Sequence, residues 1–313
     1  MVTGGNLTGI LLMAFGAPDS PEAVEPFLRK LLGNRPLPEP VLAKIKERYN
    51  LIGGKSPLLE ITQTQAFKLE EKLKQRGKSC RVYTGMCYWH PFIEEALAQM
   101  VEDGINRVLA LSLSPHYSRV STGAYLRQLE AALDRYGGSL QVTRAGDWYD
   151  HPLYIQALAE KVGEGLRQFP EDVRAEVPLV FSAHSVPLEH IEGGDPYLEQ
   201  VEKTASALAE TLGEVQWQLA FQSKGAGKGR WLEPEVEKVL EQLRDQGKKN
   251  VLLVPLSFVS DHVETLYDMD IALKEYARSL GLNFVRCSTL NDSPAFIEAL
   301  VQIIEQKLDQ EWK

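Results

Sequence analysis

Eight short apolar segments, rich in strand-forming residues and bounded by turn residues, recur along this chain of 313 residues. Stretches with helical periodicity separate most of them, such as residues 62–76, where Ala66, Leu69 and Leu73 share one face. Strands that alternate with helices form parallel sheets joined by right-handed crossovers. We therefore predict an α/β fold. The predicted strands are residues 9–15, 79–85, 106–113, 140–145, 177–183, 215–221, 250–257 and 283–287.

The predicted strands fall into two sets of four, which indicates two similar lobes. The fourth strand ends near Gly146, and a polar segment follows it. The third segments of the two sets, 106–114 and 250–257, resemble each other, although two buried strands can also be alike by chance. We predict two Rossmann-like lobes, 1–146 and 147–313, each with a four-stranded parallel sheet flanked by helices, and a ligand cleft between them. Whether the last helix packs back on the first lobe is left open.

The composition excludes several classes of protein. A formal net charge of −9 argues against a protein that coats nucleic acid or an anionic membrane. The first apolar run, residues 10–15, is too short for a signal peptide or a membrane span. Three cysteines without a C-x-x-C pair form no disulfide framework and are typical of a cytosolic protein. We predict a cytoplasmic protein with no nucleic-acid partner and no integral membrane segment.

A histidine directly follows the fifth predicted strand. Because the carboxyl ends of parallel strands open onto the ligand crevice, we expect His184 to lie at a binding site. Ser182, Ser185 and Pro187 make a rigid turn that aims the ring. Imidazole titrates near neutrality, so it can accept a proton or bind a metal ion. The alternative is an ordinary hydrogen-bonded core histidine.

Two carboxylates follow the seventh predicted strand. Glu264 and Asp268 are four residues apart and therefore share one face of the predicted helix. Like charges at this spacing repel and usually lie on a solvated surface. Here the surrounding residues are apolar, which favours cation binding or proton transfer.

The first half of the chain offers a different set of groups. Arg48, Tyr49 and Ser56 lie near the end of a predicted helix, and Tyr125 lies in the helix after the third strand. Arginine and serine bind carboxylates, and tyrosine offers a flat apolar face. A large, flat, anionic ligand that receives a cation would need both halves of the chain.

At these residues the chain resembles the ferrochelatases, which insert Fe²⁺ into a porphyrin late in heme biosynthesis. The matching segments follow the family's order along nearly the whole chain. They are residues 11–18, 48–49, 52–58, 85–92, 114–118, 181–187, 194–197, 222–224, 231–232 and 258–267.

The resemblance implies specific roles for the residues of the second half. His184 matches the family's invariant histidine, Glu264 its metal-binding glutamate and Asp268 the next acid on that helix. We expect His184 and Glu264 to be catalytic and to meet over the centre of the macrocycle from opposite walls. His184, Glu264 and Asp268 are the expected metal ligands.

The resemblance also implies porphyrin contacts in the first half. Phe15, Arg48, Tyr49, Ser56 and Tyr125 match positions that contact the macrocycle or its propionates. The chain departs from the pattern at Phe15, where the branch that uses coproporphyrin III usually has tyrosine. The additional cysteines that hold an iron–sulfur cluster in some relatives are absent, so we expect no such cluster and no other cofactor. Porphyrin and Fe²⁺ are the expected substrates.

We favour coproporphyrin III over protoporphyrin IX as the substrate, because residues 48–57 and the short C-terminus suit the coproporphyrin branch. Phe15 and residues 89–91 point the other way. Two alternatives stay open: a cobalt or sirohydrochlorin chelatase of the same architecture, and a two-lobed tetrapyrrole-binding protein without catalytic activity. Transient partners from the heme pathway are also left open.

Overall fold

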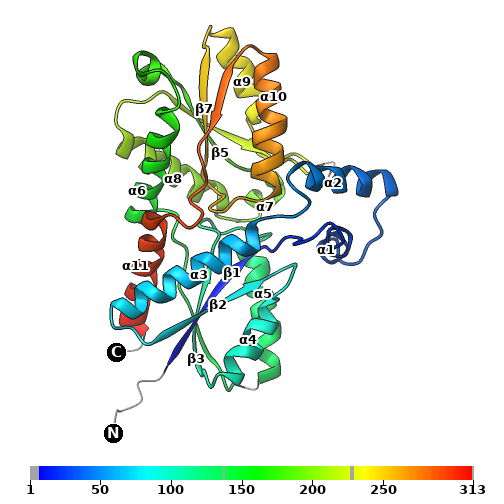
Figure 1. Cartoon of the computed structure of the whole chain (residues 1–313), viewed down its shortest axis with the longest axis vertical. Coiled ribbons are helices and arrows are strands. Elements are labelled where there is room, and N and C mark those ends of the chain that lie inside the picture. Colours follow the sequence, from blue (N-terminus) through cyan, green and yellow to red (C-terminus); the bar gives the residue numbers. More distant parts are fainter. Residues whose placement is uncertain (1–6, 137, 226–228, 312–313) are drawn as a thin grey trace. The chain divides into compact units, whose positions relative to one another are not determined.

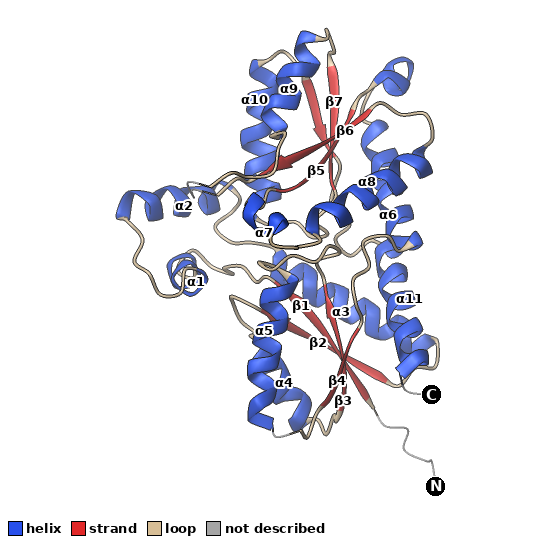
Figure 2. Ribbon diagram, turned by 180° about the vertical axis from the view of Figure 1, so that it is seen from behind, coloured by secondary structure: helices blue, strands red, loops and turns tan. Residues whose placement is uncertain are grey.

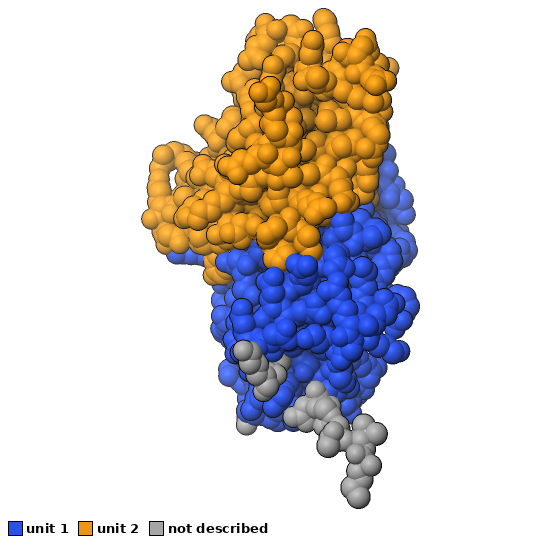
Figure 3. Space-filling model, turned by 90° about the vertical axis from the view of Figure 1, so that its left-hand side faces the viewer, with its two compact units in different colours: residues 1–115, 119–148, 291–313 blue, residues 116–118, 149–290 orange. Residues whose placement is uncertain are grey.

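The computed structural model describes residues 7–136, 138–225 and 229–311. The chain forms two compact units, which Figure 3 shows in different colours. Unit 1 comprises residues 1–115, 119–148 and 291–313, and unit 2 comprises residues 116–118 and 149–290. The cleft predicted between two lobes is not tested by the fold of either unit and stays a prediction.

Unit 1 contains a four-stranded sheet in which all neighbouring strands run parallel. In the spatial order β2-β1-β3-β4, its strands are β1 (Thr8–Ala14), β2 (Cys80–Met86), β3 (Arg107–Ser112) and β4 (Gln141–Arg144). Every residue of the central strand β1 is buried. A strand with helices on both faces has no solvated side, which is why apolar residues run consecutively through it.

Helices of unit 1 cover both faces of this sheet, whereas α1 (Val24–Leu31) and α2 (Glu39–Leu51) lie beside it (Figures 1 and 2). The other helices of the unit are α3 (Leu58–Gln75), α4 (Ile93–Glu102), α5 (Thr122–Leu133), the 3₁₀ helix η1 (Asp134–Tyr136) and α11 (Pro294–Glu311). Helix α11 comes from the far end of the chain and packs on α3. Lys72 lies 3.0 Å from Glu298, and Arg76 lies 2.6 Å from Glu305. These ion pairs join the last helix to unit 1.

Unit 2 repeats the same sheet topology. Its strands are all parallel, and their order, β6-β5-β7-β8, places the first strand of the set between the second and the third, as in unit 1. The strands are β5 (Leu179–His184), β6 (Trp217–Gln222), β7 (Asn250–Pro255) and β8 (Asn283–Arg286). All eight strands predicted from the sequence are present, and the predicted pair of four-stranded parallel sheets is confirmed.

Helices also flank the sheet of unit 2. They are α6 (Pro152–Leu166), η2 (Glu171–Glu176), α7 (Leu188–Glu192), α8 (Tyr197–Leu212), α9 (Val236–Asp245), η3 (Glu264–Leu273) and α10 (Lys274–Ser279). On one face of the sheet, Val180 and Ala220 share a buried cluster with Val239 of α9 and with Met269 of η3. This face therefore carries η3, the helix that begins at Glu264. No helix in the described ranges is long and apolar enough to cross a bilayer.

The segment that begins at Glu264 differs from the predicted ordinary helix. It is a π-helix of ten residues, Glu264–Leu273, which continues into the α-helix α10. Its hydrogen bonds run over five residues instead of four, and such segments are rare and frequent at functional sites. The hydrophobic pattern alone could not distinguish the two helix types, since Met269 and Leu273 are spaced as in an α-helix.

The buried imidazole of His116 predicts an acid-sensitive fold. His116 is 1% exposed in unit 2, and its Nε2 lies 2.9 Å from the hydroxyl of Thr204. Burial lowers the pKa of His116 to about 3. The unfolded chain takes up this proton below about pH 6.5, whereas the folded chain does so only near pH 3, so stability falls as the pH drops through this window.

We expect the His116→Gln variant to lose this sensitivity. Between pH 7 and pH 5, the wild type should lose about 2 kcal/mol of unfolding free energy more than the variant does. Urea unfolding at the two pH values measures the difference. An equal loss in both proteins would show that His116 does not carry the acid sensitivity.

Candidate functional site

His184 stands at the carboxyl end of β5 and is fixed by four contacts within unit 2. Its backbone nitrogen donates to the Ser257 hydroxyl at 3.1 Å, and its carbonyl accepts from the Tyr197 hydroxyl at 2.9 Å. Its Nδ1 lies 2.5 Å from the Ser185 carbonyl. The imidazole Nε2 lies 3.4 Å from Oε2 of Glu264. The side chain is about one-third exposed.

The contact to Ser185 determines which imidazole nitrogen is free to react. A carbonyl oxygen only accepts, so Nδ1 must carry the proton and donate it. In the neutral ring Nε2 then carries a lone pair and can only accept a hydrogen bond. It faces a carboxylate oxygen of Glu264, and this oxygen is also an acceptor. Oε2 accepts no hydrogen bond from the described residues. The pair is therefore stabilised when a proton or a metal cation lies between the two groups.

The start of η3 positions Glu264. The hydroxyl of Thr265 accepts from the backbone nitrogen of His262 at 3.0 Å and donates to the His262 carbonyl at 3.0 Å. The ring of His262 packs edge-on against Phe258, whose ring is also edge-on to His184. The two segments that carry the functional groups are thus packed together through Phe258.

Arg286 anchors the same helix from strand β8, a role that the sequence analysis missed. Its Nε and Nη2 both lie 2.6 Å from the carboxylate of Asp270 in η3, and its Nη1 lies 3.2 Å from Asp261 before that helix. Only 8% of its side chain is exposed. No motif marks Arg286 in the sequence, because its partners come from a different element.

Asp268 lies four residues after Glu264 in η3 and does not complete a metal site. Its Oδ2 is 3.5 Å from the Ser223 hydroxyl at the end of β6. Within the described parts of the chain, no three His, Cys, Asp or Glu side chains gather closely enough to hold a metal ion. His184 and Glu264 supply two donors, so iron held there as a substrate would take its other donors from porphyrin or water.

The expected approach from opposite walls of the macrocycle is wrong. His184 and Glu264 both belong to unit 2, where β5 and η3 pack on each other, and their reactive atoms are 3.4 Å apart. A porphyrin does not fit between two atoms in contact. Both groups therefore present their reactive atoms from the same side.

The predicted porphyrin contacts all lie in unit 1, and two of them belong to its core region. Phe15 follows β1 and is half-buried, with its ring centre 4.7 Å from that of Tyr88. Tyr125 is 2% exposed, and its hydroxyl lies 3.4 Å from that of Ser114. Burial raises the pKa of the Tyr125 phenol, so this group stays protonated.

The remaining three candidates lie on or just after α2. Arg48 is half-buried, whereas Tyr49 and Ser56 are each 3% exposed. The Ser56 hydroxyl accepts from the backbone nitrogen of Leu58 at 3.3 Å at the start of α3. Of these three side chains, Arg48 therefore presents the most surface to a ligand, and the roles of all five remain predictions.

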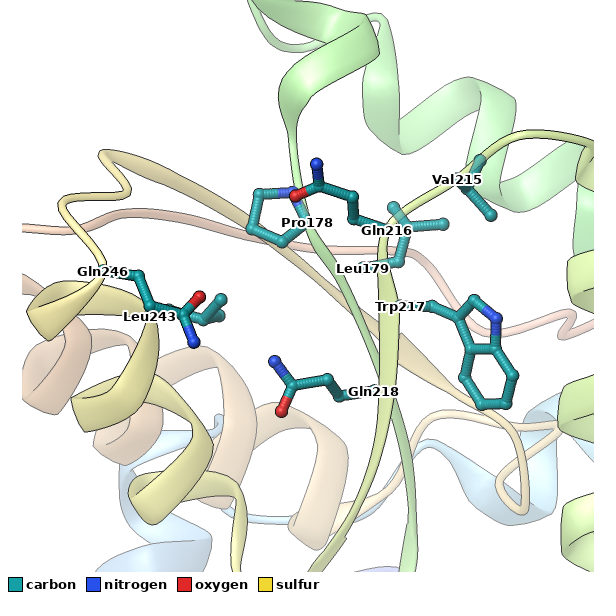
Figure 4. Close-up of a pocket in the computed structure, with 8 residues that line it drawn as sticks. All are labelled: Pro178, Leu179, Val215, Gln216, Trp217, Gln218, Leu243 and Gln246. Atoms are coloured by element: carbon teal, nitrogen blue, oxygen red, sulfur yellow. The ribbon is translucent and has the colours of Figure 1, made fainter.

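A hollow of about 380 Å³ in unit 2 lies away from this site (Figure 4). Its lining residues are Pro178, Leu179, Val215, Gln216, Trp217, Gln218, Leu243 and Gln246. The hollow is at the amino ends of β5 and β6, whereas His184 stands at the carboxyl end. Ligands of open α/β sheets bind at the carboxyl ends, so this hollow carries no part of the candidate site.

Comparison with known proteins identifies full-length relatives. The family model described as Ferrochelatase matches residues 7–308. The ferrochelatase of Geotalea uraniireducens (strain Rf4) is 46% identical over 321 residues, covering 97% of this chain and 99% of that protein. The ferrochelatase of Deinococcus radiodurans is 39% identical over 301 residues, covering 96% of this chain and 95% of that protein.

Solved structures show the same architecture at low sequence identity. SirB from Bacillus subtilis with Fe³⁺ gives a TM-score of 0.59 at 13% identity, with 98% of each chain covered. The sirohydrochlorin chelatase SirB from Bacillus subtilis subspecies spizizenii in complex with cobalt gives a TM-score of 0.58 at 12% identity, with 97% of each covered. At these identities the likeness supports the fold alone.

Proposed function

Because the chain belongs to the ferrochelatase family, we propose that it inserts Fe²⁺ into coproporphyrin III through His184 and Glu264. The family makes it a lyase of the metal-chelatase kind, whose substrates are a porphyrin and iron. The observation that carries the assignment of roles is the contact of 3.4 Å between Nε2 of His184 and Oε2 of Glu264. Two facing acceptors of this kind attract a proton or a cation.

The reaction defines what these groups must do. Two N–H bonds of the porphyrin break, both nitrogens keep their electron pairs and bind iron, and two protons leave. Nε2 of His184 accepts the pyrrole protons, since Nδ1 already donates to the Ser185 carbonyl. Glu264 stabilises the imidazolium or holds the incoming Fe²⁺, with Asp268 behind it. Porphyrin nitrogens supply the other donors to the iron.

The choice of coproporphyrin III assigns a carboxylate-binding role to unit 1. Coproporphyrin III carries four propionates, whereas protoporphyrin IX carries two, and arginine is the side chain best suited to bind a carboxylate. Arg48 is half-buried on α2, which Figure 1 shows apart from the sheet of its unit. Because the chain has a net charge of −9, its overall field does not attract an anionic ligand. Local basic groups such as Arg48 must bind the propionates instead.

We expect Arg48→Leu to raise the KM for coproporphyrin III by about 10- to 100-fold, because one charge-assisted hydrogen bond contributes about 1.5–3 kcal/mol. The matched control is Lys44→Leu, which removes a positive charge from an exposed position of the same helix and should change KM less than about threefold. Steady-state kinetics with Fe²⁺ under anaerobic conditions measure both values. Equal effects of the two variants would remove Arg48 from the site.

One assay tests the choice of porphyrin. The two porphyrins are compared at saturating anaerobic Fe²⁺, and we expect kcat/KM for coproporphyrin III to be at least about tenfold higher, the effect of one such interaction. A preference for protoporphyrin IX would overturn the substrate proposal while the proposed roles of His184 and Glu264 stand.

The second candidate function is that of a cobalt or sirohydrochlorin chelatase, favoured by the likeness of the fold to SirB. Turnover of Co²⁺ and Fe²⁺ with several tetrapyrroles distinguishes it from a ferrochelatase. A passive tetrapyrrole carrier would bind porphyrin without proton release.

The predictions of a cytoplasmic location, of no iron–sulfur cluster and of transient heme-pathway partners stay open to experiment.

A further inference from the structure

Gln222 carries a buried amide with no hydrogen-bond partner among the described residues. The residue is 4% exposed, and neither Nε2 nor Oε1 of its side chain is paired within that part of the chain. Most buried polar groups of native proteins are hydrogen-bonded, and leaving one unpaired costs stability. Proteins typically keep a polar group that lowers their stability where that group has a function.

The position of Gln222 relates it to the candidate site. It pairs with His184 in the parallel register of β5 and β6, so their Cα atoms are about 4.8 Å apart and their side chains leave the same face of the sheet. Figure 4 shows this alternation in β6, where Trp217 and Gln218 point to opposite sides of the strand. Gln218 and Gln222 are four residues apart and share a face.

Ser182 extends the same polar surface. It lies two residues before His184 in β5 and therefore on the same face, it is 1% exposed, and its Oγ has no partner among the described residues. The Glu264 helix η3 covers this face, since its Met269 packs with Val180 of β5 and Ala220 of β6. Two unpaired polar side chains thus lie under the helix that carries Glu264.

We propose that Gln222 and Ser182 hold the water through which the pyrrole protons leave His184 and Glu264. This inference rests on the proposed function. A bound macrocycle covers the side from which it is metallated, so protons taken up by Nε2 need another route to solvent. The Gln222 amide donates from Nε2 and accepts at Oε1, which orients a water molecule, and the Ser182 hydroxyl both donates and accepts. The proton passes to water as the imidazole regains its lone pair.

The test is Gln222→Met, which keeps the volume and removes the amide. We expect kcat to fall about 10- to 100-fold, the usual effect of losing a residue that supports the reacting side chains, with the KM for porphyrin within about twofold. The solvent deuterium isotope effect on kcat should rise, because proton release becomes slower. The melting temperature should change by less than about 2–4 °C, because the substitution removes no hydrogen bond to another described residue.

Gln218→Met is the matched control, since it makes the same change on the same face of the same strand at its amino end. It should leave kcat and the isotope effect at wild-type values. A merely structural role of Gln222 predicts the opposite pattern for Gln222→Met, with a lower melting temperature and an unchanged isotope effect, and that result would overturn the inference.

The two levels of the proposal fail in different ways. If His184→Ala is inactive and Gln222→Met has wild-type kcat, only the water-holding role is wrong. If His184→Ala itself retains turnover, the proposed role of His184 in iron insertion is wrong, and the water-holding role falls with it. Ser182→Ala provides a second variant, expected to lower kcat with the same rise in the isotope effect.

Discussion

Replacing His184 by alanine should lower kcat for iron insertion by at least about 10³-fold, while the Kd for porphyrin changes by less than about threefold. The imidazole is the group whose free Nε2 faces Glu264, so its loss removes the proton acceptor and one iron donor together. Fold integrity should be kept. The backbone hydrogen bonds of residue 184 to Ser257 and Tyr197 do not involve the ring.

Porphyrin fluorescence quenching measures binding, and loss of free-base absorbance under anaerobic Fe²⁺ measures turnover. His151→Ala is the matched control, because it removes a half-buried histidine of the same unit at the start of α6. Near-normal turnover of His184→Ala would refute the assignment. A loss of porphyrin binding as large as the loss of turnover would make His184 a binding residue instead.

Replacing Arg286 by methionine should lower the unfolding free energy by about 3 kcal/mol. Removing one member of a buried ion pair leaves uncompensated charge, here on Asp261 and Asp270. Both carboxylates keep some contact with solvent, which limits the effect to the lower part of the usual range. Since these aspartates belong to η3 and to the segment before it, we also expect kcat to fall as Glu264 moves away from His184.

Chemical denaturation with urea measures the stability change, and Arg244→Met is the control. Arg244 pairs with Asp245 at 2.7 Å on an exposed surface, so its loss should cost less than about 1 kcal/mol. Adding Asp261→Asn and Asp270→Asn to Arg286→Met should restore part of the stability, because the unpaired charges disappear. A loss below about 1 kcal/mol for Arg286→Met alone would contradict the proposed anchoring.

The strands of both sheets could be predicted because a buried parallel strand is encoded locally. The seven residues of β1 are all buried, and four consecutive ones, residues 10–13, are strongly apolar, so their neighbours in sequence suffice to identify the strand. The division into two sets of four could also be predicted, whereas the spatial order of the strands in each sheet came only from the structure. His184 and Glu264 could be singled out because each directly follows a strand or a strand-end turn.

Other features depend on partners that are distant in sequence. The π-helix at Glu264 has the apolar spacing of an α-helix, and nothing in its ten residues specifies hydrogen bonds over five positions. Arg286 meets Asp261 and Asp270 only once β8 lies beside β7. The near-complete burial of Tyr125 likewise follows from the packing of α5, although its sequence position suggested a ligand-facing aromatic ring.

Proton release during a single anaerobic turnover tests the central claim most directly. A pH-indicator dye records protons in weak buffer while the free-base porphyrin absorbance reports metallation. We predict that two protons are released per porphyrin consumed and that proton release and metallation proceed at the same rate. In the His184→Ala variant with porphyrin bound, neither signal should appear. Porphyrin uptake by the wild type without proton release, or release of both protons by His184→Ala at the wild-type rate, would contradict the account.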